Sequence, residues 1–362
     1  MIRRILVEHG AEDYPMTRAI AERAGLPIRF ISPDQDLPPG VEQDKETLRL
    51  VRFKGEFLKP CPGTTGPGYI CCGYKILHVG LNCPLDCSYC ILQAYVNQPS
   101  VRVFVNLPEA LSEVGRTIDE SPAGTIWRIG TGEFTDSLAV DPLVGWHDLL
   151  PEFFSKRRNA VLELKTKTDL VEGVIRSAFL DKLIVSWSLN TPEIASREEH
   201  GAPSISRRLR AAARCQKEGL VVGFHFDPLF YYPGWREGYQ RVVEMLARYV
   251  EPSRVIWISL GAMRYMPALK EIIRRRHCRS LVLDGEFIPA LDGKMRYFKP
   301  IRIELYSFLK ELIEQWHPDP GLYLCMEREE VWERSLGWSP RGPQGLSSYL
   351  DDRVRKVFKD IG

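Results

Sequence analysis

The stretch that decides the fold of this 362-residue chain is Cys83-Pro-Leu-Asp-Cys87-Ser-Tyr-Cys90, which follows the apolar run Ile76 to Leu81. Its spacing, C-x3-C-x2-C, gathers three thiolates in one short loop, where they can bind a single small metal cluster. A closed iron–sulfur cluster normally takes four cysteines, so three leave one iron open to a ligand from outside the protein. An open coordination position separates a reactive metal centre from a structural one.

This spacing resembles the signature of the radical S-adenosylmethionine (SAM) enzymes. The resemblance implies that SAM binds the open iron through its amino and carboxylate groups, and that one electron splits SAM to leave a 5′-deoxyadenosyl radical. The alternative is a zinc loop or three reduced structural thiols. Zinc would need a fourth protein ligand, usually from a second Cys/His pair, and the next cysteine along the chain is the isolated Cys215.

Composition and charge are those of an ordinary globular protein, with 44% hydrophobic and 27% charged residues and a net charge of +2. So small a net charge does not by itself indicate a nucleic-acid binder, and a DNA or RNA surface would have to be a local patch. We find no signal peptide and no apolar run long enough to span a bilayer, so we expect a reducing, cytoplasmic location without membrane contact. Three further cysteines show no metal-site spacing and are predicted to be reduced structural thiols: Cys61, Cys71 and Cys72.

Residues 1–74 are predicted to form a small N-terminal α/β domain. We expect a strand over Ile2 to Val7, a helix over Thr17 to Ala24 and a second strand over Ile28 to Ile31. A connector rich in Pro, Gly and Asp follows at residues 32–40. A later Pro/Gly-rich stretch leads to a domain boundary near Tyr74.

Residues 75–285 alternate between strands and helices, which predicts a parallel sheet with helical crossovers. Six β-α units are too few for an eight-fold barrel and suit an open, partial (β/α)6 barrel, whose chemistry gathers at the carboxyl ends of the strands. Residues 286–362 are expected to add a hairpin and a helix over Arg302 to Gln315. The predicted strands are Lys75 to Val79, Thr125 to Ile129, Ala160 to Lys165, Leu183 to Leu189, Val221 to Phe226 and Val255 to Ser259; the helices are Leu107 to Asp119, Leu143 to Ser155, Leu170 to Ser177, Ile205 to Glu218 and Gly238 to Val250.

Polar residues follow the ends of these predicted strands, where they would meet around one site. Glu133 and Asp136 lie in a glycine-containing turn after the second strand, and Glu133 could accept a hydrogen bond from the SAM ammonium. Lys167, after the third strand, could bind a carboxylate. Ser188 and Asn190, after the fourth, suit ribose hydroxyls. Each has an ordinary alternative, such as a common α/β turn or a solvated lysine.

Several short stretches, in a fixed order over most of the chain, are more specific together than any one of them. They are Ile5-Leu6-Val7-Glu8 with Tyr14-Pro15, Cys87-Ser-Tyr89-Cys90-Ile-Leu92-Gln93, Thr135-Asp136 with Leu138, Thr166-Lys167, Ser188-Leu-Asn190, Gly223-Phe-His-Phe-Asp-Pro-Leu and Gly234-Trp235-Arg-Glu-Gly-Tyr239. The set resembles the spore photoproduct lyase family within the radical SAM superfamily. The resemblance implies a partial (β/α)6 barrel, a 4Fe–4S cluster and SAM as cofactors, and direct reversal of a methylene-bridged thymine dimer in DNA. It also implies that Thr135, Lys167, Ser188 and Asn190 contact SAM.

Two positions depart from the family pattern, in which they help to return a hydrogen atom to the thymine radical. Family lyases carry a cysteine at the place that falls on Glu133 here, and no cysteine lies between Cys90 and Cys215. They also carry a tyrosine directly after the third cluster cysteine, where this chain has Ile91. The preceding tyrosine is kept as Tyr89, a candidate catalytic residue. The departures predict a relative with a changed lesion, stereochemistry or substrate.

The C-terminal region supplies the remaining candidates. Cys325 lies in an apolar stretch that reads as a buried strand, and it could be a substitute hydrogen donor if it faces the barrel mouth. The Asp292-Gly293 pair predicts a tight hairpin turn that offers DNA both phosphate-binding cations and aromatic rings, with a solvated hairpin as the alternative. The predicted DNA contacts are Lys294, Arg296, Tyr297, Lys299 and Arg302.

The leading hypothesis is thus a radical SAM lyase that repairs a pyrimidine dimer in DNA. We expect a monomer that takes its electron from a donor such as flavodoxin or ferredoxin. One alternative is a radical SAM enzyme that modifies RNA, a peptide or a small molecule, which the two departures and the near-neutral charge favour. The other is a nucleic-acid-binding Fe–S protein without turnover, against which the set of SAM-contact positions speaks.

Overall fold

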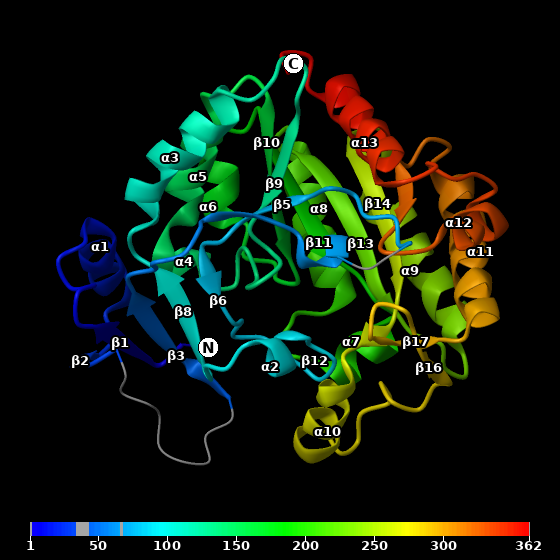
Figure 1. Ribbon diagram of the computed structural model, residues 1–362, viewed down its shortest axis with the longest axis horizontal. Coiled ribbons are helices and arrows are strands. Elements are labelled where there is room, and N and C mark those ends of the chain that lie inside the picture. Colours follow the sequence, from blue (N-terminus) through cyan, green and yellow to red (C-terminus); the bar gives the residue numbers. More distant parts are fainter. Residues whose placement is uncertain (1, 34–42, 66–67, 362) are drawn as a thin grey trace.

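The structure is a computed structural model that describes residues 2–33, 43–65 and 68–361 (Figure 1). Its largest sheet curls into an open half-barrel with helices on the outer face. At one edge β4 (Leu58–Pro60) pairs antiparallel with its neighbour, and the other strands run parallel. From that edge they are β5 (Lys75–Leu77), β9 (Trp127–Gly130), β10 (Ala160–Thr166), β11 (Leu183–Ser188), β13 (Val221–Leu229), β14 (Val255–Ala262) and β18 (Leu322–Leu324).

The six predicted barrel strands are present in the predicted order, which confirms the partial barrel. The predicted buried strand near Cys325 is β18, which adds to the far edge beside β14. In β10 the strand alternation places Glu163 and Lys165 on the inner face, while their apolar neighbours Leu162 and Leu164 are buried in the core. A strand covered on both faces thus keeps a polar line toward the barrel interior.

The helices between these strands also match the prediction, with one correction. The expected helix over Leu143 to Ser155 is divided into α4 (Asp141–Val144) and α5 (Trp146–Ser155). Gly145 between them has a φ of 78°, a left-handed conformation that ends α4 and that glycine adopts readily. The other predicted helices are present as α3 (Leu107–Asp119), α6 (Glu172–Arg176), α8 (Ile205–Lys217) and α9 (Trp235–Tyr249). The helices α7 (Pro192–Glu198) and α10 (Pro267–Arg276) were not predicted.

The N-terminal part forms a second sheet beside the barrel. The predicted β-α-β unit is present as β1 (Arg4–Glu8), α1 (Pro15–Ala24) and β2 (Ile28–Ile31), whereas most of the predicted connector at residues 32–40 lies outside the described residues. The sheet order is β2-β1-β3-β8-β6. It includes β3 (Asp44–Val51), β6 (Gly80–Leu81) and β8 (Ser100–Phe104). Because β6 and β8 come from beyond Tyr74, this sheet shares elements with the barrel segment, and the boundary at residue 74 stays a prediction.

One segment crosses the open side of the half-barrel. The crossing segment, residues 61–65 and 68–74, leaves β4 and returns to β5 (Figure 1). At its start and end the Cys61 amide donates to the Tyr74 carbonyl at 3.0 Å, and near its middle the Ile70 amide donates to the Glu327 carbonyl at 2.9 Å. Because Glu327 follows β18 closely, the crossing segment connects the two edges of the sheet.

The C-terminal region packs against the β14–β18 side. The predicted hairpin is present as β16 (Phe287–Pro289) and β17 (Met295–Tyr297), which β15 (Arg264–Tyr265) extends to three strands. The predicted helix is α11 (Lys299–Trp316). Two further helices were not predicted, α12 (Glu329–Leu336) and α13 (Pro343–Val357). Among the described residues, no helix has the length and apolarity that crossing a membrane requires.

Candidate active site

The three loop cysteines are held in place by the surrounding protein. Cys83 and Cys87 are buried and Cys90 is half-buried. On one side of the loop, β7 (Asp86–Cys87) pairs with β12 (Glu199–His200). On the other, the Gln93 side chain in α2 (Leu92–Tyr95) donates to the carbonyl oxygens of Cys87 and Ser88, at 3.1 and 2.9 Å. The loop conformation therefore follows from the protein's own contacts.

Without bound metal, burial keeps the Cys83 and Cys87 thiols of this loop protonated. Burial raises the pKa of Cys83 to about 12, and it raises the pKa of Cys87 well above the ordinary value although Lys167 opposes that shift. Thiolates are the metal ligands, so bound metal must supply the positive charge that stabilises them here. No three Cys, His, Asp or Glu side chains in the described ranges are arranged to hold one metal ion. A cubane cluster, in contrast, binds each thiolate on a separate iron.

Three predicted SAM contacts have polar groups that the described residues leave without a hydrogen-bond partner. Thr135 Oγ1 is buried and unpaired, and we find no hydrogen bond from the Ser188 hydroxyl or the Lys167 ammonium. The Lys167 ammonium lies 5.7 Å from the centre of the Tyr89 ring and interacts electrostatically with Cys87. A buried polar group without a partner is costly, and Thr135 Oγ1 is such a group. These three groups therefore fit a polar cofactor beside the cysteines.

The other predicted SAM contacts are already engaged within the protein. Asp136 accepts hydrogen bonds from the Thr166 hydroxyl at 2.7 Å and from the Lys167 amide at 2.8 Å. Asn190 donates to the Pro228 carbonyl at 2.8 Å and accepts from the Tyr239 hydroxyl at 3.0 Å. These two side chains hold the strand ends that carry Lys167 and Ser188. Their direct contact with SAM stays a prediction.

Tyr89, the predicted catalytic tyrosine, is buried in a charged network behind the loop. Its hydroxyl donates to Glu199, whose other carboxylate oxygen lies 2.5 Å from the buried Arg208 guanidinium. Burial, with the Glu199 charge next, raises the pKa of Tyr89 well above the ordinary value. The phenol therefore stays protonated. Its place beneath Lys167 suits positioning of that lysine, and its catalytic role stays a prediction.

Sequence analysis did not identify a network of polar side chains inside the barrel below this site. The buried Glu163 accepts from Trp257 Nε1 and lies 2.9 Å from His225 Nε2. Burial opposes ionisation of Glu163, but His225 lowers the pKa to about 2. Above it, Lys165 forms an ion pair with Glu133. The alternation Glu163-Leu-Lys165-Thr-Lys167 was the available signal, because charged residues at every second position of a buried strand must face a polar interior.

Cys325 lies on the opposite wall of the mouth, at the end of β18. The Arg264 guanidinium donates to its Sγ at 3.4 Å and forms a bidentate pair with Asp227 at 3.0 Å. Lys294 also faces this group, since its charge interacts with Arg264 and Cys325. The mouth therefore has a thiol among cations on the far side from the cluster loop. This placement fits the prediction that Cys325 faces the barrel mouth, while its role as a donor stays a prediction.

Comparison with known protein families identifies the family to which this site belongs. The model of the family described as spore photoproduct lyase matches residues 72–318. The chain belongs to the spore photoproduct lyase family. Similar curated relatives include the spore photoproduct lyase of Clostridium acetobutylicum, 26% identical over 67% of this chain and 73% of the relative, and that of a Geobacillus species, 27% identical over 54% and 58%.

Solved structures of spore photoproduct lyase confirm the fold. One, complexed with dinucleoside spore photoproduct, superposes with a TM-score of 0.78 over 90% of this chain and 98% of that chain, at 23% identity. Another, a mutant with bound AdoMet and dinucleoside spore photoproduct, gives a TM-score of 0.77 with the same coverage. As a spore photoproduct lyase family member the chain is a radical SAM lyase, and a 4Fe–4S cluster and SAM are its cofactors.

The C-terminal hairpin of this spore photoproduct lyase relative differs from the expected DNA surface. Arg296, Tyr297 and Arg302 are buried instead of being displayed. Arg296 pairs with Asp292 at 2.6 Å, and Arg302 pairs with the buried Glu327 at 2.9 Å. The sequence showed a basic, aromatic hairpin but not the acidic partners and packing that take these side chains inward.

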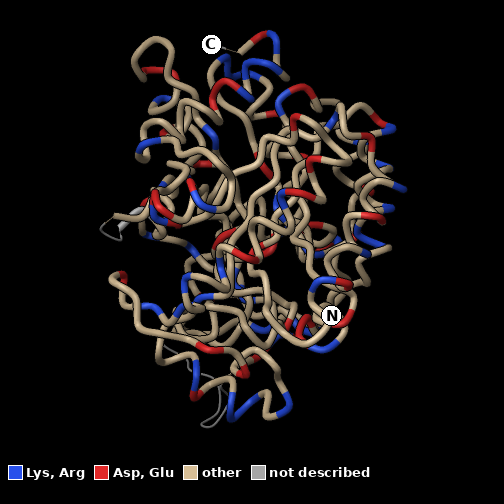
Figure 2. Tube along the Cα trace, turned by 90° about the vertical axis from the view of Figure 1, so that its right-hand side faces the viewer, with Lys and Arg blue, Asp and Glu red and all other residues tan. Residues whose placement is uncertain are grey.

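Two cations of the hairpin region remain as candidate DNA contacts. Lys299 is exposed and pairs with Glu330 at 2.7 Å, whereas Lys294 is half-buried at the barrel mouth. Figure 2 shows basic and acidic residues interspersed along this side of the molecule. The lyase relative therefore has no broad basic face here, and any DNA contact would involve single cations near the mouth.

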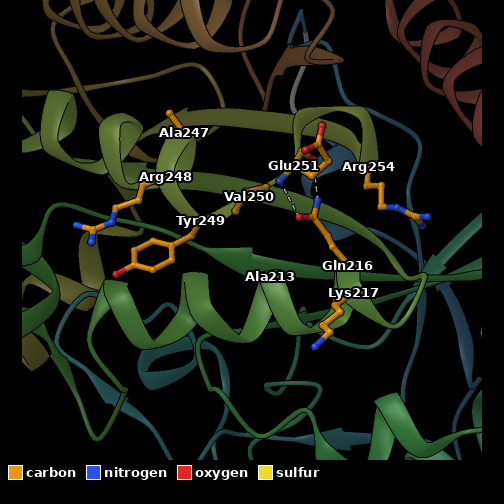
Figure 3. A pocket seen from close by; sticks show the side chains of 9 residues that line it. All are labelled: Ala213, Gln216, Lys217, Ala247, Arg248, Tyr249, Val250, Glu251 and Arg254. Atoms are coloured by element: carbon orange, nitrogen blue, oxygen red, sulfur yellow. Dashed lines mark hydrogen bonds between the residues drawn. The ribbon is translucent and has the colours of Figure 1, made fainter.

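A surface hollow of about 400 Å3 lies away from this chemistry (Figure 3). It is lined by residues at the carboxyl ends of α8 and α9, including Gln216 and Glu251. The Gln216 side chain donates to the Glu251 carbonyl at 2.9 Å and accepts from the Glu251 amide at 2.8 Å. This pairing ties two helix ends together at the amino-terminal end of the barrel strands, so the hollow is a structural junction on the opposite side from the cysteines.

Proposed function

We propose that this chain repairs a methylene-bridged thymine dimer, or a closely related pyrimidine dimer, in DNA by direct reversal. The observation that carries the proposal is the group of polar atoms without partners at Thr135, Lys167 and Ser188, next to three thiols in a C-x3-C-x2-C loop. Family membership over residues 72–318 supports the same reaction. A complex of a related lyase with dinucleoside spore photoproduct supports the substrate class.

The residues of the site would have separate roles. Cys83, Cys87 and Cys90 would hold the cluster, and Lys167 with Ser188 and Thr135 would orient SAM above it. When bound, these cofactors supply the 5′-deoxyadenosyl radical that takes hydrogen from the bridging carbon. The barrel wall excludes water, and the charged residues of the mouth receive the lesion. A dimer pairs poorly, which lowers the cost of flipping it out of the duplex.

The experiment is anaerobic incubation with SAM, dithionite and a panel of dimer-containing oligonucleotides. We expect loss of one dimer type with recovery of two intact bases, measured by mass spectrometry, together with 5′-deoxyadenosine. Cys87→Ala should abolish both products, whereas Cys278→Ala, which changes an exposed thiol, should retain them. Cleavage of SAM without change in any dimer would reject DNA repair.

A specific observation favours a second function, namely action on another substrate. Glu133 stands where the family has its hydrogen-returning cysteine, and Ile91 replaces the tyrosine after the third cluster cysteine. A peptide, RNA or small molecule that quenches its radical differently would not need these residues. Under either function, we also propose a flavodoxin or ferredoxin as electron donor, a monomeric state and a cytoplasmic location.

DNA binding separates the two functions. If DNA is the substrate, duplex affinity should fall with salt, with log K decreasing by about 0.9 per phosphate neutralised for each unit of log salt concentration. Lys294→Ala and Lys299→Ala should each lower that slope by up to about 0.9 without unfolding the protein. Arg302→Ala should instead destabilise the fold by about 3–5 kcal/mol, because it leaves Glu327 buried without its partner. Binding that is absent, or independent of salt, would favour the second function.

A further inference from the structure

The helix α10 and the residues directly after it concentrate positive charge on the surface. Residues 270–279 contain five basic side chains and one acidic side chain, a local charge of +4 in a chain whose total is +2. Arg274, Arg275 and Arg279 are exposed, and the one acid, Glu271, pairs with Arg274 at 3.0 Å. We call residues 270–279 the basic surface.

The basic surface contacts the loop that carries the cluster cysteines. The Arg276 guanidinium pairs with Asp86, the residue before Cys87, at 2.9 Å, and it also donates to the Gln93 side chain. Gln93 in turn donates to the Cys87 carbonyl at 3.1 Å. Through these contacts α10 packs against α2 (Figure 1). One ion pair therefore separates the basic surface from the residue next to a cluster ligand.

A buried carboxylate joins the same two segments a second time. Glu198 accepts hydrogen bonds from the Ser280 hydroxyl at 2.7 Å and from the Leu281 amide at 2.8 Å, directly after the basic surface. It also accepts from the hydroxyl of Ser88, which lies between two of the cluster cysteines. A protein that binds the basic surface is thus brought close to the cysteine loop.

A hollow of about 280 Å3 lies between α10 and the end of α2. Its lining combines the apolar Val96 and Ile272 with Arg275 and Arg276. Arginine is enriched in protein interfaces and pairs well with carboxylates, so this hollow suits an acidic side chain of a partner. Cations in a last helical turn also stabilise the helix terminus, but that role requires neither the hollow nor the contact with Asp86.

The place of the basic surface favours a reductant over DNA as the partner. The polar groups expected to bind SAM follow the ends of the barrel strands, whereas the basic surface contacts the cysteine loop at Asp86 and Gln93. The open iron has to face SAM and the substrate, which leaves the cysteine side for a protein that delivers electrons. Because electron transfer slows steeply with distance, the donor should dock close to a cluster ligand.

We propose that the basic surface is the docking site of a small acidic protein that carries one electron at a time and reduces the cluster. This inference rests on the electron donor that is part of the proposed function. One electron leaves the reduced carrier and enters the oxidised cluster, and no bond in this chain forms or breaks. Complementary charge would steer the carrier to the surface and raise its association rate.

Charge reversal tests the docking site by direct binding. The variant is Arg274→Glu/Arg275→Glu, and the probe is oxidised flavodoxin, titrated calorimetrically into the cluster-loaded protein. We expect at least tenfold weaker binding at low ionic strength, with most of the difference lost in 0.5 M salt because the charges are then screened. The matched control is Lys217→Glu/Arg248→Glu, which makes the same charge change at the hollow of Figure 3 and should bind like the parent.

The same variants separate protein-driven from chemical reduction. Stopped-flow absorbance should show that flavodoxin hydroquinone reduces the cluster of Arg274→Glu/Arg275→Glu at least tenfold more slowly than that of the parent. Dithionite, which needs no docking site, should reduce both proteins to the same extent. Parent-like flavodoxin binding and reduction in this variant would overturn the inference. Loss of duplex DNA affinity with parent-like flavodoxin reduction would also overturn it, and would make the surface a DNA contact.

The exposed Cys278 provides a test without charge reversal, because it lies within the basic surface. A maleimide-linked polyethylene glycol on this thiol should slow reduction by flavodoxin and leave reduction by dithionite unchanged. Cys278→Ser, treated in the same way, should behave like the untreated parent. A labelled parent that flavodoxin reduces at the unlabelled rate would contradict docking here.

Failure of the inference and failure of the proposed function can be told apart. A parent that neither flavodoxin nor ferredoxin binds or reduces would overturn the proposed donor, and this inference with it. A parent that flavodoxin reduces through the basic surface but that repairs no dimer would overturn DNA repair alone and support the docking site.

Discussion

Two groups of three cysteines flank the strand β5, one on the cluster loop and one on the crossing segment, and their surroundings differ. The loop thiols Cys87 and Cys90 interact electrostatically with Lys167, and the nearby predicted SAM contact Thr135 has no hydrogen-bond partner among the described residues. Cys61, Cys71 and Cys72 instead lie on the crossing segment, which backbone hydrogen bonds tie to both edges of the sheet. A thiol that meets a cation and open polar groups is suited to bind a charged cofactor. Thiols on a segment held by backbone hydrogen bonds fit the structural role that the sequence predicts for them. The neighbours, not the residue type, assign the chemistry.

The largest expected effect is on iron content, which should depend on the loop cysteines but not on Cys61, Cys71 and Cys72. Anaerobically reconstituted protein should hold about four irons per chain. Cys83→Ala, Cys87→Ala and Cys90→Ala should each reduce this to background, because the cluster has no spare protein ligand. Iron and sulfide assays with the visible charge-transfer absorption provide the measurement.

The matched controls are serine substitutions of Cys61, Cys71 and Cys72, which should retain iron at the parent level. Loss of the cluster in Cys71→Ser or Cys72→Ser would show that both groups bind metal, and the contrast between them would disappear. Stoichiometric zinc without visible absorption in the parent would remove the radical SAM assignment itself.

The sequence was sufficient for the features that depend on local pattern. The six barrel strands follow from the alternation of apolar strand and amphipathic helix, and the cluster loop follows from its spacing. Gly145 shows where such reasoning stops, because one left-handed residue divides a helix that the apolar pattern runs through. The apolar pattern indicates which residues are buried, whereas the backbone angle of Gly145 depends on how α4 packs.

Features that depend on distant partners could not be predicted. Arg302 looked like a phosphate contact until the structure placed Glu327 beside it. The backbone hydrogen bond from Ile70 to Glu327 joins two distant parts of the sequence, and it depends on the path that the crossing segment takes. Composition and spacing contain no information about that path. The roles of Thr135, Lys167 and Ser188 were available from family resemblance, but their lack of partners could be seen only in three dimensions.

The second prediction concerns the polar side chains that we expect to bind SAM beside the cluster loop. Lys167→Ala should weaken SAM binding by about 10- to 100-fold, since hydrogen bonds to charged groups contribute about 1.5–3 kcal/mol. Ser188→Ala should cost about fivefold, as expected for a neutral hydrogen bond of about 1 kcal/mol. Calorimetric titration of the cluster-loaded protein measures both effects, and iron content should be unchanged.

Lys156→Ala is the matched control, because this lysine is exposed directly after α5 and pairs only with Glu152 in the described structure. It should bind SAM like the parent. Parent-like affinity in both Lys167→Ala and Ser188→Ala would mean that the polar groups without partners beside the loop do not serve the cofactor.

The smallest expected effect is a difference in the pH at which the two groups become reactive. In reduced, metal-free protein, iodoacetamide should modify Cys72 with a half-maximal rate near pH 6, because the Cys71 hydrogen bond lowers its pKa to about 6 and only the thiolate reacts. Cys83, whose pKa burial raises to about 12, should stay unmodified through neutral pH. Cys71→Ala removes the largest cause and should move the Cys72 midpoint upward, toward the ordinary thiol value of about 8.5. The exposed Cys278 provides the reference for reagent access. If Cys72 follows the same curve with and without Cys71, the Cys71 thiol is not the cause of the lowered Cys72 pKa.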